Sequence, residues 1–304
     1  MFMETTLFFK TMIILSSQLG IVLLGCLFFI KKANQAYRED SKLLGLRFIG
    51  SVNMKNQLDL IPYNELPKSF PKTMTKEDEY QRDFTQPVNI FKNTITRKEI
   101  ALNEAEESSL LKLGFKHVTQ TNKSVNFLGF AWIISLCMTL FFVSGVSGVS
   151  ITAQALMFSL NSILTGPLIG LIMLEMDEND GYKALKIVFF VTILTGFIGY
   201  SDFISFSEST IFAAILFISL IGIVLFNIVR TFRNISRPTT RAAAIFGAFV
   251  FSLYLLYDFN LLKKAGEIAD LNNWNTAFTI AFTIYLDIIN LLLEILEAMG
   301  DQTF

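Results

Sequence analysis

Two aspartates stand inside apolar stretches near the C-terminal end of the chain, Asp258 in YLLYDFN and Asp287 in YLDIIN. A carboxylate near the centre of a bilayer costs at least ~2.5–3.5 kcal/mol, so its presence there indicates a function. Two carboxyl groups that approach each other cannot both ionise cheaply and can share one proton. The pair therefore predicts a pH-sensitive latch between two helices. If both ionised, the two carboxylates could instead bind a hard cation such as Ca²⁺.

Further polar residues follow Asp287 at helical spacing, since Asn290, Glu294 and Glu297 stand three, seven and ten positions after it. This spacing places the four side chains on one stripe of a helix. We predict that the pair is supported by polar groups from both segments, namely Tyr254, Tyr257, Asn290 and Glu294. The same residues also allow a purely structural interpretation, in which the aspartates hydrogen-bond to Tyr, Asn and backbone groups and only lock two helices together.

The composition indicates a membrane protein. Charged residues make up 17% of the 304 positions, against about 25% in an ordinary soluble domain. Of the 51 charged residues, 28 fall within 31–125, which leaves the remaining chain strongly apolar. Seven apolar segments are long enough to cross a bilayer, at 11–30, 126–148, 150–175, 183–200, 207–229, 241–262 and 273–297. The chain is thus expected to be an all-α integral membrane protein with about seven transmembrane helices.

Three regions follow from this pattern. Residues 1–30 are predicted to form an N-terminal transmembrane anchor that is retained rather than cleaved, because the segment ends at Lys31 and Lys32 without a small-residue cleavage site. Residues 31–125 form a polar, partly extended insert, and residues 126–304 a transmembrane bundle. Basic residues gather in the insert and in the loop around Arg233, so the insert and the C-terminus are expected inside and the N-terminus outside.

The insert carries two local signals. Residues 61–71 hold three prolines and read as extended surface chain. Residues 97–113 have helix formers at amphipathic spacing and predict a helix. The region is poor in apolar residues, so it is either a poorly ordered linker or an arm that orders against partner subunits.

Several classes of function are disfavoured. A net charge of −1 gives no basic field for nucleic acid. Cys26 and Cys137 lie in apolar runs, and the only histidine is His117, so no zinc site, no haem site and no disulfide scaffold is expected. Since the sequence has no nucleotide loop and no nucleophile triad, we expect no cofactor and no enzymatic activity.

Small and aromatic residues predict how the helices pack. Close helix contacts are expected at the GxxxG pair of Gly166 and Gly170, and at Gly196 and Gly199. Trp132 and Trp274 are expected at helix ends as interface anchors. A further set of polar residues is expected to share one face of the segment 150–175, namely Gln154, Asn161 and Thr165.

The depth of the two aspartates sets a condition on the last helix. If the segments ended at 262 and began at 273, Asp258 would lie about four residues from one membrane face and Asp287 about fourteen from the same face. At ~1.5 Å per residue the mismatch would be roughly 15 Å. For the pair to meet, we expect the last helix to start nearer 280.

The segments FSLYLLYDFNLLKKAGEI (251–268) and IYLDIINLLLEILEAMG (284–300) resemble the closing helices of the Bax inhibitor family, small calcium- and proton-linked membrane proteins with a seven-helix fold. The family's Tyr-Asp pair is matched by Tyr257-Asp258, and its Tyr-Leu-Asp-Ile-Ile-Asn run by residues 285–290. Residues 261–267 are similar to the mitochondrial branch, the growth-hormone-inducible transmembrane proteins.

This resemblance implies that Asp258 and Asp287 form the proton-sensing latch of a calcium leak pathway. The family's early helices also carry a basic residue that can pair with the latch, whereas 126–148 and 150–175 here contain no Arg or Lys. Where the mitochondrial branch has a histidine, Asn161 stands here. Together with the long insert, these departures favour an accessory subunit of a larger mitochondrial inner-membrane complex of respiratory-chain type, with transport reduced or lost. In that case the insert, on the matrix side, would contact other subunits. The alternative is a pH-gated Ca²⁺/H⁺ leak channel or exchanger.

Overall fold

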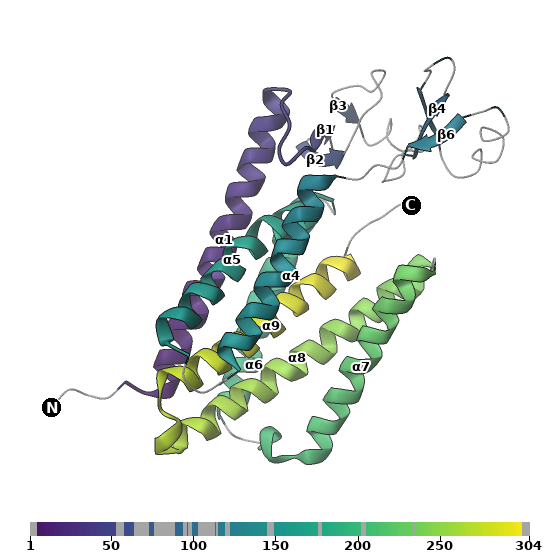
Figure 1. Ribbon diagram of the computed structural model, residues 1–304. Coiled ribbons are helices and arrows are strands. Elements are labelled where there is room, and N and C mark those ends of the chain that lie inside the picture. Colours follow the sequence, from purple (N-terminus) through teal and green to yellow (C-terminus); the bar gives the residue numbers. More distant parts are fainter. Residues whose placement is uncertain are drawn as a thin grey trace. The chain divides into compact units, whose positions relative to one another are not determined.

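The computed structural model describes residues 5–52, 58–63, 73–75, 89–93, 96, 99–102, 113, 115–118, 122–144, 149–175, 178–201, 205–233 and 235–299. In this part of the chain seven helices are long and apolar enough to cross a membrane (Figure 1). They are α1 (Leu7–Arg38), α4 (Lys123–Val143), α5 (Ile151–Glu175), α6 (Glu178–Ser201), α7 (Thr210–Phe232), α8 (Arg237–Glu267) and α9 (Trp274–Met299). The predicted class, a helical integral membrane protein, is confirmed.

The chain divides into two compact units. The first, called here the latch unit, comprises Met1–Gly25, Trp132–Gly166 and Asp180–Gly300. The second, the insert unit, comprises Cys26–Ala131, Pro167–Asn179 and Asp301–Phe304. Helix α8 with Asp258 and helix α9 with Asp287 and the polar stripe both lie in the latch unit.

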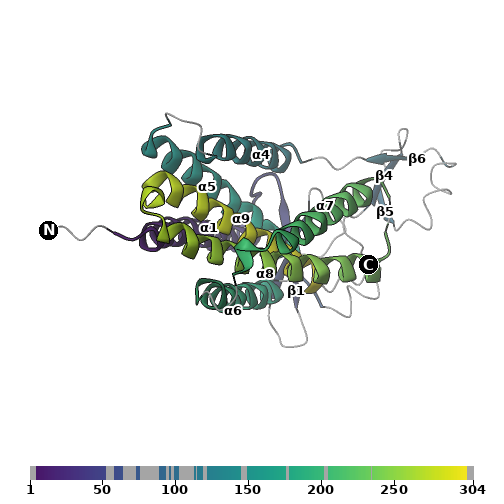
Figure 2. The ribbon, with the colours of Figure 1, turned by 90° about the horizontal axis from the view of Figure 1, so that it is seen from below.

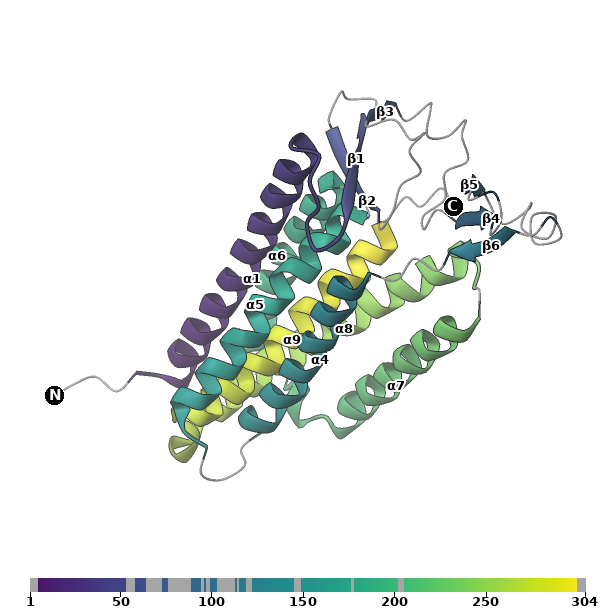
Figure 3. The same cartoon turned by 45° about the horizontal axis from the view of Figure 1, so that its top comes forward.

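In the latch unit α9 is the central helix. Its buried residues occur all around the helix, which is expected of a helix surrounded by others. Figures 2 and 3 show α9 running between α8 on one side and α5 on the other. A short 3-10 turn, η3 (Ala269–Leu271), joins α8 to α9.

Two glycines let α6 approach α8 closely. A Cβ atom at Gly196 would lie 3.3 Å from the ring of Phe259, and one at Gly199 would meet the carbonyl oxygen of Leu256. The predicted packing role of both glycines is confirmed, because only the absence of a side chain permits this contact.

The first helix is tied into the latch unit by polar contacts. Lys10 is buried, and its ammonium donates to the backbone oxygen of Asn272 at 2.8 Å and to the side-chain oxygen of the same residue at 3.1 Å. The same ammonium stands 5.9 Å from the ring centre of Trp274, the first residue of α9. Further along α1, Gln18 donates to the hydroxyl of Ser159 at 3.1 Å. The N-terminal segment of α1 therefore packs as a member of this helix group.

The insert unit contains two small β-sheets. In the first, β1 (Arg47–Val52) pairs antiparallel with β2 (Leu58–Tyr63) and parallel with β3 (Thr73–Thr75). In the second, β4 (Asn89–Asn93) pairs antiparallel with both β5 (Glu99–Leu102) and β6 (Phe115–Val118). The sheets bury the apolar side chains of Phe48, Ile49, Leu60, Tyr63 and Phe91.

The sheets correct two predictions for the insert. The helix predicted over 97–113 is wrong at residues 99–102, which form β5, and residues 103–112 lie outside the described residues. Pairing overrides local helix propensity here, since Ile100 stands opposite the buried Phe91. Extended chain is confirmed for 61–63, although Pro62 and Tyr63 are buried rather than on the surface, and 64–71 lie outside the described residues.

Within the insert unit, the C-terminal half of α1 packs closely on α5 at a glycine. A Cβ atom at Gly170 would lie 3.1 Å from the ring of Phe29 and 3.2 Å from the carbonyl oxygen of Cys26. The thiol of Cys26 also lies 3.5 Å from the sulfur of Met173. The predicted packing role of Gly170 is confirmed.

Candidate proton and cation site

Asp258 of α8 and Asp287 of α9 face each other in the interior of the latch unit. Their exposed fractions are 4% and 7%, and their carboxyl groups are close enough for a hydrogen bond between them. The Oδ2 atom of each is buried and accepts no hydrogen bond from any N–H or O–H group in the described part of the chain. A hydrogen bond between two carboxyl groups needs a proton on one of them. The geometry therefore fits a pair that shares a proton.

The aspartates meet although α9 starts at Trp274, so the prediction of a start nearer 280 is wrong. The predicted end of the preceding helix was also too early, because α8 continues to Glu267. Asp258 thus lies nine residues before the end of α8, and Asp287 thirteen after the start of α9. At ~1.5 Å per residue the two depths are ~14 and ~20 Å, which reduces the mismatch to about 6 Å.

The two tyrosines predicted to support the pair lie in different surroundings. Tyr254, one turn before Asp258, is close enough for its phenol group to interact electrostatically with both carboxyl groups. Tyr257 directs its ring toward α7, where the ring centre of Phe212 is 6.4 Å away. Tyr254 is therefore part of the site, and Tyr257 contributes to the packing of α7 against α8.

The opposite face of α9 is fixed by a buried polar network. The hydroxyl of Tyr285, itself 1% exposed, donates to the hydroxyl of Thr165 at 3.1 Å. Thr165 also accepts from the indole N–H of Trp132 at 2.9 Å and donates to the backbone oxygen of Asn161 at 2.8 Å. The amide of Asn161 in turn donates to the hydroxyl of Ser135 at 3.1 Å. Sequence analysis did not assign this role to Tyr285, because a tyrosine in an apolar run looks like ordinary core.

The same network corrects the prediction for Trp132. Its ring was expected at a helix end as an interface anchor, yet it lies nine residues into α4, which begins at Lys123. Its N–H is satisfied inside the helix group by Thr165. Because Tyr285 and Asp287 are two residues apart, about 200° around the helix, α9 is held by hydrogen bonds on two opposite faces.

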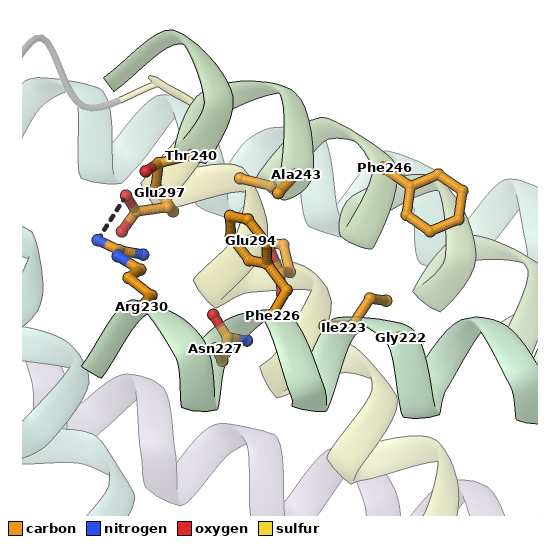
Figure 4. Close-up of a pocket in the computed structure, with 11 residues that line it drawn as sticks. Gly222, Ile223, Phe226, Asn227, Arg230, Thr240, Ala243, Phe246, Glu294 and Glu297 are labelled. Atoms are coloured by element: carbon orange, nitrogen blue, oxygen red, sulfur yellow. Dashed lines mark hydrogen bonds and ion pairs between the residues drawn. The ribbon is translucent and has the colours of Figure 1, made fainter. Parts of the chain in front are cut away.

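The outer end of the polar stripe lines a pocket of about 180 Å³ between α7, α8 and α9 (Figure 4). Glu294 rests on α8 at Gly247, where a Cβ atom would lie 2.5 Å from the carboxyl carbon of Glu294. At the edge of the pocket, Arg230 of α7 donates from Nη2 to Oε1 of Glu297 at 3.1 Å. Asn290 lies between Asp287 and Glu294 on the same stripe and is partly buried.

Two polar residues of this region were not singled out from the sequence. Arg230 ends an apolar run and looked only like a membrane boundary. Asn260, fully buried, accepts from the backbone N–H and the hydroxyl of Ser207 at 2.9 and 2.6 Å, and donates to the backbone oxygen of Gly199 at 3.1 Å. Asn260 thus binds α8 to the end of α6 and to the short turn η2 (Phe206–Glu208).

The number of oxygen ligands at the aspartate pair limits how it could bind a cation. Within the described ranges no three His, Cys, Asp or Glu side chains gather as metal ligands. Ca²⁺ takes six to eight oxygen ligands, and two carboxylates supply at most four. A Ca²⁺ at the pair would therefore keep water molecules or add backbone oxygens.

The sequence of the chain matches the model of a known protein family. The family model described as "inhibitor of apoptosis-promoting Bax1" matches residues 110–304. The matched range is well over half of the chain and contains α4 to α9, with both aspartates and the network around Tyr285. The chain belongs to the Bax inhibitor-1 family.

Proposed function

We propose that the protein is a proton-controlled Ca²⁺ leak or Ca²⁺/H⁺ exchanger, with Asp258 and Asp287 as its latch. The observation that supports this most directly is the close approach of two buried carboxyl groups on neighbouring helices. Membership of the Bax inhibitor-1 family is consistent with this role. The sequence favoured the subunit alternative because the early helices lack a basic partner for the latch and the chain carries a long insert and an N-terminal anchor.

The charges on the two aspartates predict how the latch responds to a change of pH. While one proton is shared, the pair attracts and α8 stays against α9. When the proton is lost, two negative charges face each other in a medium of low dielectric, where their repulsion is strong. Raising the pH should therefore separate the helices at this point and increase the flow of cations.

Ca²⁺ flux into vesicles tests the proposal. The full chain is reconstituted into lipid vesicles that contain a Ca²⁺-sensitive dye, and influx is compared with that of empty vesicles. Wild-type protein should carry Ca²⁺, whereas the double variant Asp258→Asn/Asp287→Asn should lose the pH dependence of the influx. Glu267→Gln, an exposed residue at the end of α8, is the matched control. The same Ca²⁺ influx in protein-containing and empty vesicles would rule out the proposal.

A second candidate function is an accessory subunit of a larger membrane assembly, with little or no transport. Two observations favour it. The helices α4 and α5 carry no basic residue beyond Lys123 at the first turn of α4, so they offer the latch no cationic partner. The insert unit also holds two folded sheets, a surface of the kind that can bind another protein.

The accessory-subunit function predicts where the protein resides and how it migrates on a native gel. We infer a mitochondrial inner membrane from the similarity of residues 261–267 to the mitochondrial branch of the family. The basic residues of the insert and of the loop after α7 predict that the N-terminus lies outside and that the insert and C-terminus lie in the matrix. After gentle detergent extraction, a subunit should migrate with a large membrane complex on a native gel. Migration as a free monomer at every detergent concentration would count against this candidate.

A further inference from the structure

The pocket between α7, α8 and α9 lies where all three helices end. Arg230 is in the last turn of α7, Thr240 in the first turn of α8, and Glu297 in the last turn of α9. These three residues line the polar end of the pocket, and Ile223 and Phe246 line the apolar part further along the helices (Figure 4). The polar end is therefore at the depth where a membrane meets water.

Glu294 brings a carboxylate into this pocket, one turn of α9 deeper than Glu297. Its carboxyl group lies against Gly247 of α8, where a Cβ atom would displace it from this position. The charged groups that act on it are Glu297 of its own helix and Arg230 of α7, and α8 adds no charge where Gly247 touches it. Because the Arg230 guanidinium is engaged with Glu297, no ion pair holds Glu294 within the described residues.

The distance from Glu294 to the latch is short along the helix. Asn290 stands four residues before Glu294, and Asp287 three residues before Asn290. At ~1.5 Å per residue the two steps are ~6 and ~4.5 Å, spans that one water molecule each can bridge. Chains of carboxyl groups inside membrane helices are the usual means of proton transfer. The latch itself has the unpartnered, nine-tenths buried Oδ2 atoms that a proton would satisfy, and Tyr254 is the titratable group facing it from α8.

We propose that this pocket is the entrance through which protons reach the aspartate pair, with Glu294 as the intermediate carrier. A proton from water in the pocket forms an O–H bond with the Glu294 carboxylate. That bond then breaks, and the proton passes through water held beside Asn290 to Asp287, which returns Glu294 to its ionised form. The inference rests on the proposed latch function and adds the side of the membrane whose pH the latch senses, the side of the C-terminus.

Water access to the pocket is tested first and without transport. Ala243 lines the pocket, and Ala243→Cys is made together with Cys137→Ser, because Cys137 is exposed. A membrane-impermeant thiol reagent is added to vesicles from one side at a time, with a C-terminal tag reporting orientation. The introduced thiol should react only from the side of the C-terminus. Ala281→Cys, at a fully buried position of α9, should stay unlabelled. No reaction at residue 243 from either side would overturn the inference.

Rapid pH changes applied to one side of the vesicle membrane at a time then test Glu294 as the proton carrier. In Glu294→Gln, Ca²⁺ influx should respond at least about tenfold more slowly to a pH jump on the side of the C-terminus, as expected when a proton-transfer group is removed. Its response to a jump on the other side should not change, Glu294→Asp should retain most of the rate, and Glu267→Gln should behave as wild type. An unchanged response in Glu294→Gln with an active wild type would overturn the inference alone. Inactive wild type would overturn the proposed latch function and this inference with it.

Discussion

Asp258 and Asp287 bring their carboxyl groups within hydrogen-bonding reach of each other across the contact of α8 with α9, and each is more than nine-tenths buried. Because carboxylates accept but do not donate, a hydrogen bond between the two needs a proton on one of them. On the far side of α9, Tyr285 is anchored to Thr165 by a hydrogen bond that needs no titration. One face of the helix is thus fixed, and the other is held by a contact that pH can break.

The stability of the protein should depend on this shared proton. As pH rises and the proton is lost, wild-type protein in detergent should lose about 1.5–3 kcal/mol, the worth of a hydrogen bond to a charged group. In Asp287→Asn the amide donates without titrating, so the profile should flatten. Thermal unfolding followed against pH measures this, with the exposed Asp270→Asn as the control. A wild-type profile as flat as that of Asp287→Asn would contradict the shared proton.

Removing the Tyr285 hydroxyl should loosen the fixed face of α9. Tyr285→Phe deletes the donor to Thr165, and we expect a loss of about 0.6 kcal/mol and at most about 1.7, the range measured for hydrogen bonds between membrane helices. Tyr257→Phe is the matched control from the other signature segment, since its ring packs against Phe212. Equal unfolding free energies for Tyr285→Phe and wild type would show that the network carries no stability.

Adding a methyl group at Gly199 should push α6 away from α8. Gly199→Ala places a Cβ against the carbonyl oxygen of Leu256, and overpacking of this kind costs about 1–3 kcal/mol. Gly129→Ala, also within a helix but with open space around it, should be neutral or stabilising. The two variants are compared by chemical unfolding in the same detergent. Equal effects would mean that the α6–α8 contact is not tightly packed.

The sequence was sufficient for the features set by hydrophobic length and by residue size. Seven spans follow from apolar runs, and the glycine contacts at Gly170, Gly196 and Gly199 from the absence of a side chain. The sequence left open whether Asp258 and Asp287 touch and made their contact depend on a late start of the last helix, whereas the structure brings them together with α9 starting at Trp274.

Features that depend on distant contacts could not be read from the sequence. The charged end of α8 resembled a loop, yet Lys263 forms an ion pair at 3.3 Å with Glu267 one turn later, and Lys264 one at 3.3 Å with Glu208. Long lysine side chains can keep their charge in water while their stems cover the helix end. Strand β5 is set by its pairing with β4, and the position of Trp132 by a hydroxyl on another helix. Glu267 is only four residues from Lys263, but Glu208 lies 56 residues before Lys264 and Thr165 lies 33 residues after Trp132.

The most direct test of the latch is Ca²⁺ influx into reconstituted vesicles over a series of pH values, with wild type and Asp287→Asn side by side. The shared-proton arrangement predicts that wild-type influx rises as the pH rises, and that the variant conducts at a rate independent of pH. Wild-type influx with the same pH dependence as Asp287→Asn would contradict the assignment of Asp258 and Asp287 as a proton-controlled latch.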